Sequence, residues 1–443
     1  MSVKVGMVSL GCCKNQVDAE LMLSRINDAG YELCTDSGLC DVVVINTCGF
    51  IESAKTEAID NILEFAALKK EGRIKRIIVT GCLSERYREQ VADELPEVDA
   101  VVGIGENGNI TDVIDRVLGG ERVLAFGDKK DLPLEGKRIV SNLPFFAYLK
   151  IADGCDNRCA YCAIPLIRGD YRSRSIESIV EEAKTLAQNG VKELIVVAQD
   201  ITRYGLDLYG ERRLPELLDE LCEIDGIEWI RLLYAYPDEI TDGLIDRIAN
   251  QPKIVKYLDL PLQHISDRIL RAMNRRGSGS EIREVIARLR ERVPGIALRT
   301  TFIVGFPGET EEDFAQLCEF VRDTRFERMG CFAFSPEEDT PAAVMDGQLD
   351  DDIKQRRCEV LMDEQLEVAE GFCRSMVGKT LDVLVEGYDR YAQSCFGRSR
   401  YDSPDIDPKV FFTTGEPVNA GDIIRVKITD WMDYDLIGEI EVL

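Results

Sequence analysis

The stretch DGCDNRCAYC, residues 153–162, places Cys155, Cys159 and Cys162 within eight residues of one another. Such tight spacing is typical of an iron–sulfur site, and a closed four-iron, four-sulfur (4Fe-4S) cluster takes four cysteines, one for each iron. Three thiolates leave the fourth iron open to a ligand from outside the protein. The alternative, half of a zinc site, needs another Cys or His nearby, and the single histidine, His264, is far away in the sequence. The stretch therefore favours an open 4Fe-4S site.

The segment around this motif alternates strands with helices. A helix is predicted over 176–188, with Ser175 as its N-cap and Gly190 as its stop signal. Six strands with six crossovers indicate a partial (β/α) barrel that is open on one side, and barrel sites lie at the carboxyl ends of the strands. The cysteine motif follows the first strand and opens onto that end. Apolar runs place the six strands at 147–151, 193–198, 229–234, 257–260, 297–304 and 329–334.

Three further cysteines each follow a predicted strand nearer the N-terminus. Apolar runs at 4–10, 41–47 and 77–81 lead into Cys12, Cys48 and Cys82, and helical patterns follow at 18–29, 52–70 and 84–95. This alternation indicates a parallel sheet covered on both faces. Parallel strands place their carboxyl ends along one edge, where open sheets bind ligands, so the three cysteines are expected to converge. A second three-thiolate cluster is favoured, and buried small residues at tight turns are the alternative.

The last part of the chain has a different pattern. A helix is predicted from 351 to about 374, and from 377 onward short alternating strands separated by turns indicate a small antiparallel β-barrel. The fold class is therefore α/β. It comprises a parallel α/β domain at 1–120, a linker at 121–140, a partial barrel at 141–375 and the β-barrel domain at 376–443.

Composition indicates the cellular compartment and the kind of partner that this protein has. No apolar run reaches the length of a membrane span, and the N-terminus lacks the layout of a signal peptide. Fifteen cysteines without an export signal indicate a reducing compartment and metal ligation, so we expect a cytoplasmic protein with no membrane partner. The formal net charge of −27 repels nucleic acid and favours a basic partner. A local basic patch at Arg168, Arg172 and Arg174 is the alternative, since it could bind nucleic acid despite the net charge.

Six stretches carry a resemblance that covers nearly the whole chain. The chain resembles the methylthiotransferases that use a radical of S-adenosylmethionine (SAM), and it is most similar to the RimO branch. That branch modifies an aspartate of ribosomal small-subunit protein S twelve, and its last part is a TRAM domain. One departure is Cys13, which stands where this family commonly has Pro, so either Cys12 or Cys13 could be the ligand. The stretches are SLGCCKNQVDAE, VINTCGFIESAK, GCLSERY, CAYCAIPLIRGDYRSR, YLDLPLQHISDRIL and TTFIVGFPGETEEDF.

The resemblance implies two 4Fe-4S clusters and SAM as cofactors. Cys155, Cys159 and Cys162 would hold the cluster that binds SAM, and the resulting radical would take hydrogen from the β-carbon of the aspartate. The other set, Cys12, Cys48 and Cys82, would hold the auxiliary cluster whose open iron carries the sulfur. Beyond the clusters, no catalytic residue is expected. Cofactor contacts are expected from Tyr161, Gln199 and Arg299, with Gln263 and His264 as weaker candidates.

Three functions compete at this point. The favoured one is methylthiolation of the aspartate in protein S twelve, with an unidentified reductant as a second partner. The second is the same chemistry on an adenosine of tRNA, but the last domain carries thirteen acidic against seven basic residues, which is poorly suited to grip phosphates. The third is a non-catalytic iron–sulfur carrier, which would need four protein ligands for each cluster.

Overall fold

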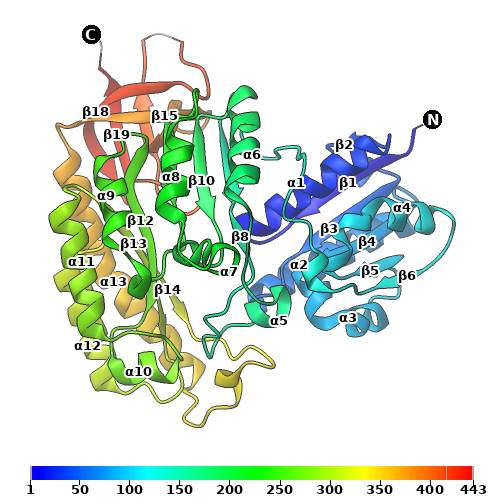
Figure 1. Cartoon of the computed structure of the whole chain (residues 1–443), viewed down its shortest axis with the longest axis horizontal. Helices are drawn as coiled ribbons and strands as arrows, with labels where there is room; N and C mark the ends of the chain where they lie inside the picture. Colours follow the sequence, from blue (N-terminus) through cyan, green and yellow to red (C-terminus); the bar gives the residue numbers. More distant parts are fainter. Residues whose placement is uncertain (1, 416, 442–443) are drawn as a thin grey trace.

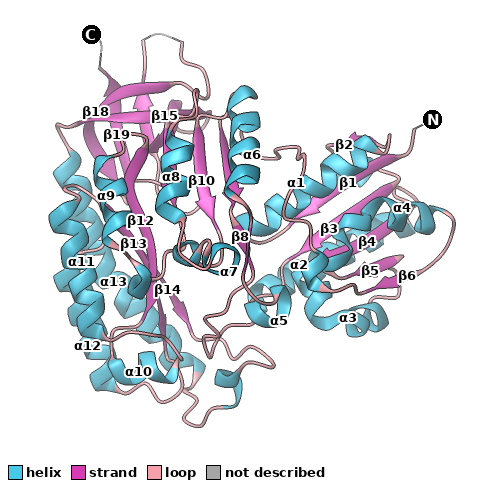
Figure 2. Cartoon of the chain, viewed as in Figure 1, coloured by secondary structure: helices cyan, strands magenta, loops and turns pink. Residues whose placement is uncertain are grey.

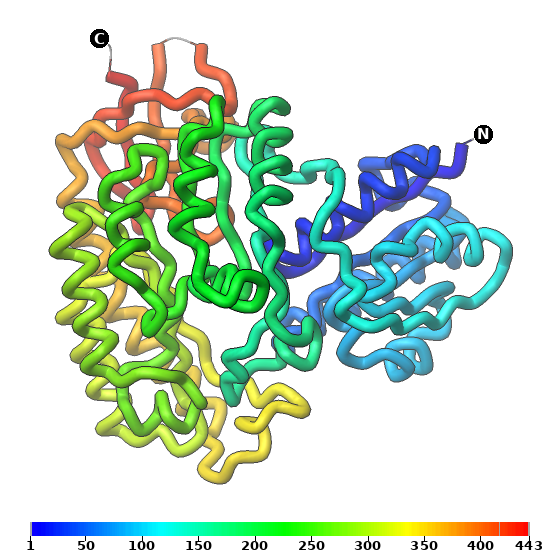
Figure 3. The backbone as a smooth tube through the Cα atoms, in the orientation of Figure 1, coloured from blue at the N-terminus to red at the C-terminus, as the bar shows by residue number. Residues whose placement is uncertain are grey.

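The computed structural model describes residues 2–415 and 417–441. An N-terminal α/β domain stands to one side of a larger (β/α) unit, and a small β-barrel covers one end of that unit (Figure 1). The tube view shows how the chain passes from the N-terminal domain to the central unit (Figure 3). This connection runs from the end of β6 at Ala125 to the start of β7 at Phe146 and contains one short 3-10 turn, Lys129–Asp131. Within the described residues, no helix combines the length and the apolar character needed to cross a membrane.

The N-terminal domain is built on a six-stranded sheet in the order β2-β1-β3-β4-β5-β6, and every neighbouring pair is parallel. Helices α2 and α3 pack on one face, and α1 and α4 pack on the other, which confirms the predicted covered sheet. The strands are β1 (Lys4–Ser9), β2 (Glu32–Cys34), β3 (Val42–Thr47), β4 (Arg76–Gly81), β5 (Ala100–Val102) and β6 (Val123–Ala125). The helices are α1 (Cys13–Asp28), α2 (Glu52–Lys70), α3 (Cys82–Glu94) and α4 (Ile110–Leu118).

Two local features of this domain differ from the sequence prediction. Helix α1 begins five residues earlier than predicted, and the extended backbone of Cys12 forms its N-cap without a side-chain hydrogen bond. The usual Ser, Thr or Asp cap signal is therefore missing from the sequence. Strands β2, β5 and β6 have only three residues each, too few to show an apolar run. Strand β6 pairs with β5 inside the range that was predicted as linker.

The central unit contains a second parallel sheet in the order β14-β13-β12-β11-β10-β7. The end strands β14 and β7 do not pair with each other among the described residues, so the barrel is open, as predicted. All six predicted strands are present as β7 (Phe146–Lys150), β10 (Glu193–Val197), β11 (Trp229–Leu232), β12 (Ile254–Gln263), β13 (Ala297–Val304) and β14 (Arg328–Ala333).

Helices cover the outer face of this sheet and bury an aliphatic core against it (Figure 2). The Ser175 side chain accepts a hydrogen bond from the backbone N–H of Ser178 at the start of α6, and Thr310 and Asp313 form a capping box at the start of α12. The covering helices are α6 (Ile176–Gln188), α8 (Leu214–Cys222), α9 (Asp242–Asn250), α11 (Gly279–Arg292) and α12 (Glu311–Thr324).

The C-terminal part confirms the predicted closed barrel and corrects one detail of its topology. Helix α13 (Asp351–Met376) leads into five strands in the closed order β15-β16-β17-β19-β18. Four of the pairings are antiparallel, but β17 pairs with β19 in parallel, so the barrel is not antiparallel throughout. The strands are β15 (Thr380–Asp389), β16 (Ser394–Ser399), β17 (Val410–Thr413), β18 (Ile423–Met432) and β19 (Asp435–Ile440).

This small barrel covers the end of the central unit at which the strands begin. Glu193, the first residue of β10, is ion-paired with Arg398 of β16 at 2.7 Å, and both side chains are buried. Asp405 accepts a hydrogen bond from the Tyr148 hydroxyl at 3.1 Å. The opposite end, at which the strands finish, is left facing the N-terminal domain.

Candidate functional site

Six cysteines from two domains line one cavity of about 360 Å³ at the carboxyl ends of both sheets. Cys12, Cys48 and Cys82 come from the N-terminal domain, and Cys155, Cys159 and Cys162 come from the loop after the first barrel strand. The expected convergence of the three strand-end cysteines is therefore present. Cys13 is half-buried, lies 3.9 Å from the Tyr234 hydroxyl and does not line the cavity. The structure thus brings Cys12, and not Cys13, to the site.

The N-terminal set is positioned by the turns that follow three neighbouring strands. Cys12 caps α1, Cys48 follows β3, and Cys82 is the first residue of α3. Gly81 before it has φ +97°, and a Cβ there would lie 2.5 Å from the Thr47 carbonyl oxygen. Only glycine permits this sharp turn from strand to helix. The three thiols are thus placed by the order of strands in the sheet.

The barrel set is positioned by a short loop with its own backbone hydrogen bonds. The N–H of Cys155 donates to the Gly169 carbonyl at 3.1 Å, and the N–H of Cys162 donates to the Cys159 carbonyl at 3.0 Å. Gly154 has φ +80°, and a Cβ there would lie 2.1 Å from the Asp170 carbonyl oxygen. The loop therefore folds back on the segment that follows it and turns its cysteines into the cavity.

The donor set fits two clusters that are each one protein ligand short. No histidine lines the cavity, and within residues 2–415 and 417–441 no group of three His, Cys, Asp or Glu side chains is spaced to hold a single metal ion. Ligands of a 4Fe-4S cluster bind different irons and stand further apart than ligands of one ion. Three thiols on each side, with no further Cys and no His among the described residues of the wall, match an open three-thiolate cluster better than a structural zinc site, which takes four protein ligands.

The protonation of the thiols differs across the site. Burial raises the pKa of the Cys82 thiol to about 12 and that of Cys155 to about 11. Burial acts on Cys12 in the same direction, but the charges of Lys14 and Arg168 outweigh it and lower the pKa of that thiol. Because iron binds the thiolate, loading either set displaces protons and is favoured as the pH rises.

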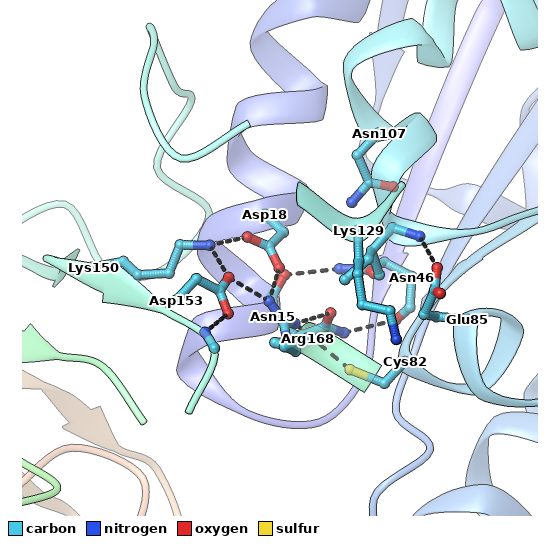
Figure 4. Close-up of polar contacts among 12 residues, drawn as sticks. Asn15, Asp18, Asn46, Cys82, Glu85, Asn107, Lys129, Lys150, Asp153 and Arg168 are labelled. Carbon is cyan, nitrogen blue, oxygen red and sulfur yellow. Dashed lines mark hydrogen bonds and ion pairs between the residues drawn. The ribbon is translucent and has the colours of Figure 1, made fainter. Parts of the chain in front are cut away.

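A buried ion-pair network links Cys82 of the N-terminal domain to Asp153, which precedes the barrel loop (Figure 4). The guanidinium of Arg168 donates to Asp18 at 2.7 Å and to Asp153 at 2.8 Å, and it lies 3.6 Å from the Cys82 sulfur. Lys150 forms ion pairs with the same two carboxylates. Burial alone would raise the pKa of Asp153, but Arg168 and Lys150 reverse the effect and hold it below its usual value. One side chain thus touches an N-terminal cysteine and the residue that precedes the barrel loop.

The basic patch considered as an alternative at Arg168, Arg172 and Arg174 is not a surface patch. The side chains of Arg168 and Arg174 are each 1% exposed, and Arg174 is paired with Glu182 at 2.6 Å. Arg172 donates to the backbone carbonyls of Lys129 and Lys130. Arg172 thus ties the interdomain connection to the barrel, and none of the three side chains is free to bind phosphates.

The other predicted cofactor contacts also reach the cavity. Gln199 lines it and donates to Asp153 at 3.0 Å, whereas Arg299 lines it beside Asp259 at 3.2 Å. Tyr161 lines it and accepts a hydrogen bond from Arg275 at 3.3 Å. Gln263 lines the wall as well, but His264 is buried behind it, 3.7 Å from Glu309, and is not part of the wall.

The lining residues that sequence reasoning missed include Lys14, Tyr234, Tyr236 and Arg275. The Arg275 guanidinium lies 4.1 Å from the centre of the Tyr236 ring and donates to the Pro261 carbonyl at 2.7 Å. Only its place two residues after Cys12 could have marked Lys14 as a site residue. The sequence prediction left Lys14 outside the helix, whereas α1 begins at Cys13 and so places Lys14 in its first turn. The two tyrosines follow β11, and nothing in their spacing marks them.

Comparison with known proteins agrees with this arrangement. Residues 149–321 match the Radical SAM superfamily, residues 4–103 match the Uncharacterized protein family UPF0004, and residues 377–440 match the TRAM domain. The chain is 50% identical over 440 residues to the ribosomal protein uS12 methylthiotransferase RimO of Lachnoclostridium phytofermentans, covering 99% of this chain and 100% of that protein. This chain belongs to the RimO family. The RimO protein of Geobacter sulfurreducens is 51% identical, covering 99% of this chain and 98% of that protein.

Among solved structures, the fold is similar to that of a radical SAM methyltransferase, TsrM from Kitasatospora setae, at a TM-score of 0.57. The match covers 86% of this chain and 81% of that chain with 14% sequence identity, so it supports the fold alone. RimO membership identifies this chain as a radical-SAM methylthiotransferase, for which two 4Fe-4S clusters and SAM are the cofactors. The carrier alternative is thereby set aside.

Proposed function

We propose that this enzyme transfers a methylthio group to the β-carbon of an aspartate in ribosomal small-subunit protein uS12. The observation that carries the proposal is the meeting of two three-cysteine sets in one cavity, in a chain whose full-length relatives are named for that substrate. Two clusters, each held by one of these three-cysteine sets, would give one site for SAM and one for sulfur. The single cavity keeps these two sites close enough to act on one substrate carbon.

The ligands are assigned by domain. Cys155, Cys159 and Cys162 would hold the cluster that binds SAM, and the strand-end cysteines of the N-terminal set, at positions 12, 48 and 82, would hold the auxiliary cluster. When bound, these groups supply the one-electron chemistry that activates an unactivated C–H bond, which side-chain acids and bases do not provide. The protein's own residues bind, orient and shield the reactants.

Several residues are suited to hold SAM at the barrel set. Tyr161 offers a ring beside the cysteines, and Arg275 fixes its hydroxyl. Gln199 is anchored by Asp153, immediately before the loop, so its carbonyl oxygen is buried without a partner among the described residues. Arg299 is held by Asp259 and brings a positive charge to the wall. These contacts orient a small polar cofactor without acid–base catalysis.

The charge of the enzyme supports a basic partner. The net charge of −27 and the acidic C-terminal domain complement a basic ribosomal protein better than they complement tRNA. A reductant must also supply the electrons for this chemistry. We place the enzyme in the cytoplasm, where ribosomes are assembled, and we infer no membrane partner.

We retain the domain division 1–120, 141–375 and 376–443, joined by a linker at 121–140. It is supported by the matched ranges 4–103, 149–321 and 377–440. Strand β6 suggests moving the first boundary a few residues later. Limited proteolysis that cuts first between residues 126 and 140 would support the division.

Mass spectrometry of ribosomal proteins and tRNA from cells lacking the enzyme tests the function. We expect uS12 to lose about 46 mass units, a methylthio group in place of hydrogen, while tRNA is unchanged. Restoring the gene should restore the mass, and the variant Cys34→Ala should also restore it, because Cys34 lies outside the cavity. Loss of a methylthio group from tRNA with unchanged uS12 would contradict the proposal.

A further inference from the structure

Lys14 reaches the cavity from the first turn of α1, two residues after Cys12. It is 7% exposed, and its ammonium nitrogen lies 3.1 Å from the centre of the Tyr234 ring. Tyr234 belongs to the barrel, and its backbone has φ +64°, a conformation that a tyrosine rarely adopts. A lysine of one domain is thus held against a strained aromatic residue of the other, at the wall that both domains share.

Every other cation on the cavity wall already has a polar partner. Arg168 donates to Asp18 and Asp153, and Arg299 is paired with Asp259 at 3.2 Å and with Asp407 at 3.4 Å. Arg275 donates to the Pro261 carbonyl and to the Tyr161 hydroxyl. These three arginines are committed to the protein itself.

Lys14 has no such partner within residues 2–415 and 417–441: no hydrogen bond or ion pair joins its ammonium group to an acceptor, although it packs on the Tyr234 ring and its charge acts on the Cys12 thiol. Asp259, the carboxylate on the wall, is occupied by the Tyr234 backbone N–H at 3.0 Å and by Arg299. An ammonium group that is largely withdrawn from water and donates no hydrogen bond is costly. An aromatic face offsets part of that cost but satisfies none of the three N–H donors. The site is therefore suited to an incoming anion.

We propose that Lys14 binds the side-chain carboxylate of the substrate aspartate and thereby selects an acidic residue for modification. This inference rests on the proposed function, in which the reacting carbon is bonded directly to that carboxylate group. A charge-assisted hydrogen bond to the carboxylate fixes the neighbouring β-carbon inside the cavity. An apolar side chain in the same place would leave the ammonium without an acceptor, and an amide would offer a neutral oxygen but no charge, so its hydrogen bond would be weaker.

SAM also carries a carboxylate, so two sources of the same chemistry must be separated. The substrate is favoured because Lys14 comes from the N-terminal domain beside Cys12, whereas SAM belongs at the barrel set with Gln199 and Arg275 nearby. Affinity for SAM should therefore be unaffected by changes at Lys14.

The test is a double-mutant cycle between Lys14 and the substrate aspartate. The probes are fluorescently labelled uS12 and its Asp→Asn variant at the modified position, titrated with the reconstituted enzyme. We expect Lys14→Met to weaken binding of wild-type uS12 by about 30-fold or more and to change binding of the Asn variant by less than about 2-fold. Lys14→Arg, which keeps the charge, should retain most of the affinity.

Controls separate this role from a structural one. Lys184→Met removes an exposed lysine of α6 and should leave both affinities unchanged, and iron content and the SAM dissociation constant are measured for each variant. Equal weakening of both forms of uS12 by Lys14→Met, or a weakened affinity for SAM alone, would overturn the inference.

Two further results keep the outcomes distinct. If Lys14→Met does not fold, the wild-type enzyme must still prefer aspartate over asparagine by about 30-fold, and absence of that preference overturns the inference. Failure of the proposed function looks different, because the wild-type enzyme would then leave uS12 unmodified while it cleaves SAM.

Discussion

The barrel and the N-terminal domain each bring three cysteines to the same cavity, but they do so by opposite means. In the barrel, one loop of eight residues holds all three and closes on itself through backbone hydrogen bonds. In the N-terminal domain, the three cysteines are separated by 36 and 34 residues and meet only because β1, β3 and β4 are neighbours in one parallel sheet. A local site depends on a loop, whereas a distributed site depends on a whole domain.

The largest expected effect comes from removing one ligand from each set. Cys159→Ala should abolish reductive cleavage of SAM, whereas Cys82→Ala should preserve that cleavage and abolish methylthio transfer. Each should lower iron content by about half, because one of two clusters is lost. Iron analysis and product assays by mass spectrometry check this. If Cys82→Ala also ends SAM cleavage while half the iron remains, the two sets do not act separately.

Arg168 contacts the N-terminal domain at Asp18 and Cys82 and the barrel at Asp153, so its loss should affect both domains. Arg168→Gln leaves Asp18 and Asp153 with Lys150 alone, and breaking a buried pair in this way costs about 3–5 kcal/mol of unfolding free energy. The auxiliary cluster should also shift to a lower reduction potential, because it loses a hydrogen bond to the Cys82 sulfur. Denaturant unfolding and redox titration measure the two effects.

The neighbouring variant Arg172→Gln is the matched control for Arg168, because its contacts are to backbone carbonyls at the edge of the connection. It should cost under about 1.5 kcal/mol. If both variants lose a similar amount of unfolding free energy, the buried network does not contribute more to stability than the backbone contacts of Arg172.

Glycine substitutions compare the two turns directly. Gly81→Ala and Gly154→Ala each place a Cβ within 2.5 Å of a carbonyl oxygen, so each should destabilise by about 2–3 kcal/mol and release iron from its own set. Gly30 and Gly190 also have positive φ but open space around them. Their alanine variants should cost about 1 kcal/mol and leave iron content unchanged. The assignment of each turn to its cluster would be wrong if Gly81→Ala released iron from the barrel set or Gly154→Ala released iron from the N-terminal set.

The last test is a pH titration of a residue that belongs to the barrel alone. Burial lowers the pKa of His264 from 6.5 to about 4, with Arg268 and Arg357 acting in the same direction. Because the unfolded chain binds this proton first, the contribution of His264 to stability is full above pH 6.5 and falls as the pH drops toward 4. It is the only histidine, so its ring proton resonance reports the titration without ambiguity. A midpoint near 6.5 in the folded enzyme would contradict this burial.

The same contrast explains what the sequence could predict. The three ligands in the loop at residues 153–162 could be predicted because they are close together in the sequence. The strand-end cysteines could be placed because apolar runs mark β1, β3 and β4. Lys14, Tyr234 and the network around Arg168 could not be predicted, because each depends on how the two domains face one another. Strands of three residues, such as β6, also escape detection, since their pairing comes from the neighbouring strand and not from their own composition.

The β-barrel at the C-terminus has a consequence for how this enzyme could evolve. Asp407 of that barrel accepts a hydrogen bond from Tyr257 at 2.6 Å and pairs with Arg299, whose guanidinium is part of the cavity wall. An appended domain of this kind is usually regarded as an exchangeable module that selects a partner. None of its own described residues lines the cavity, but it holds the wall residue Arg299 in place, so exchanging it for another domain would disturb the cavity wall as well as the choice of partner.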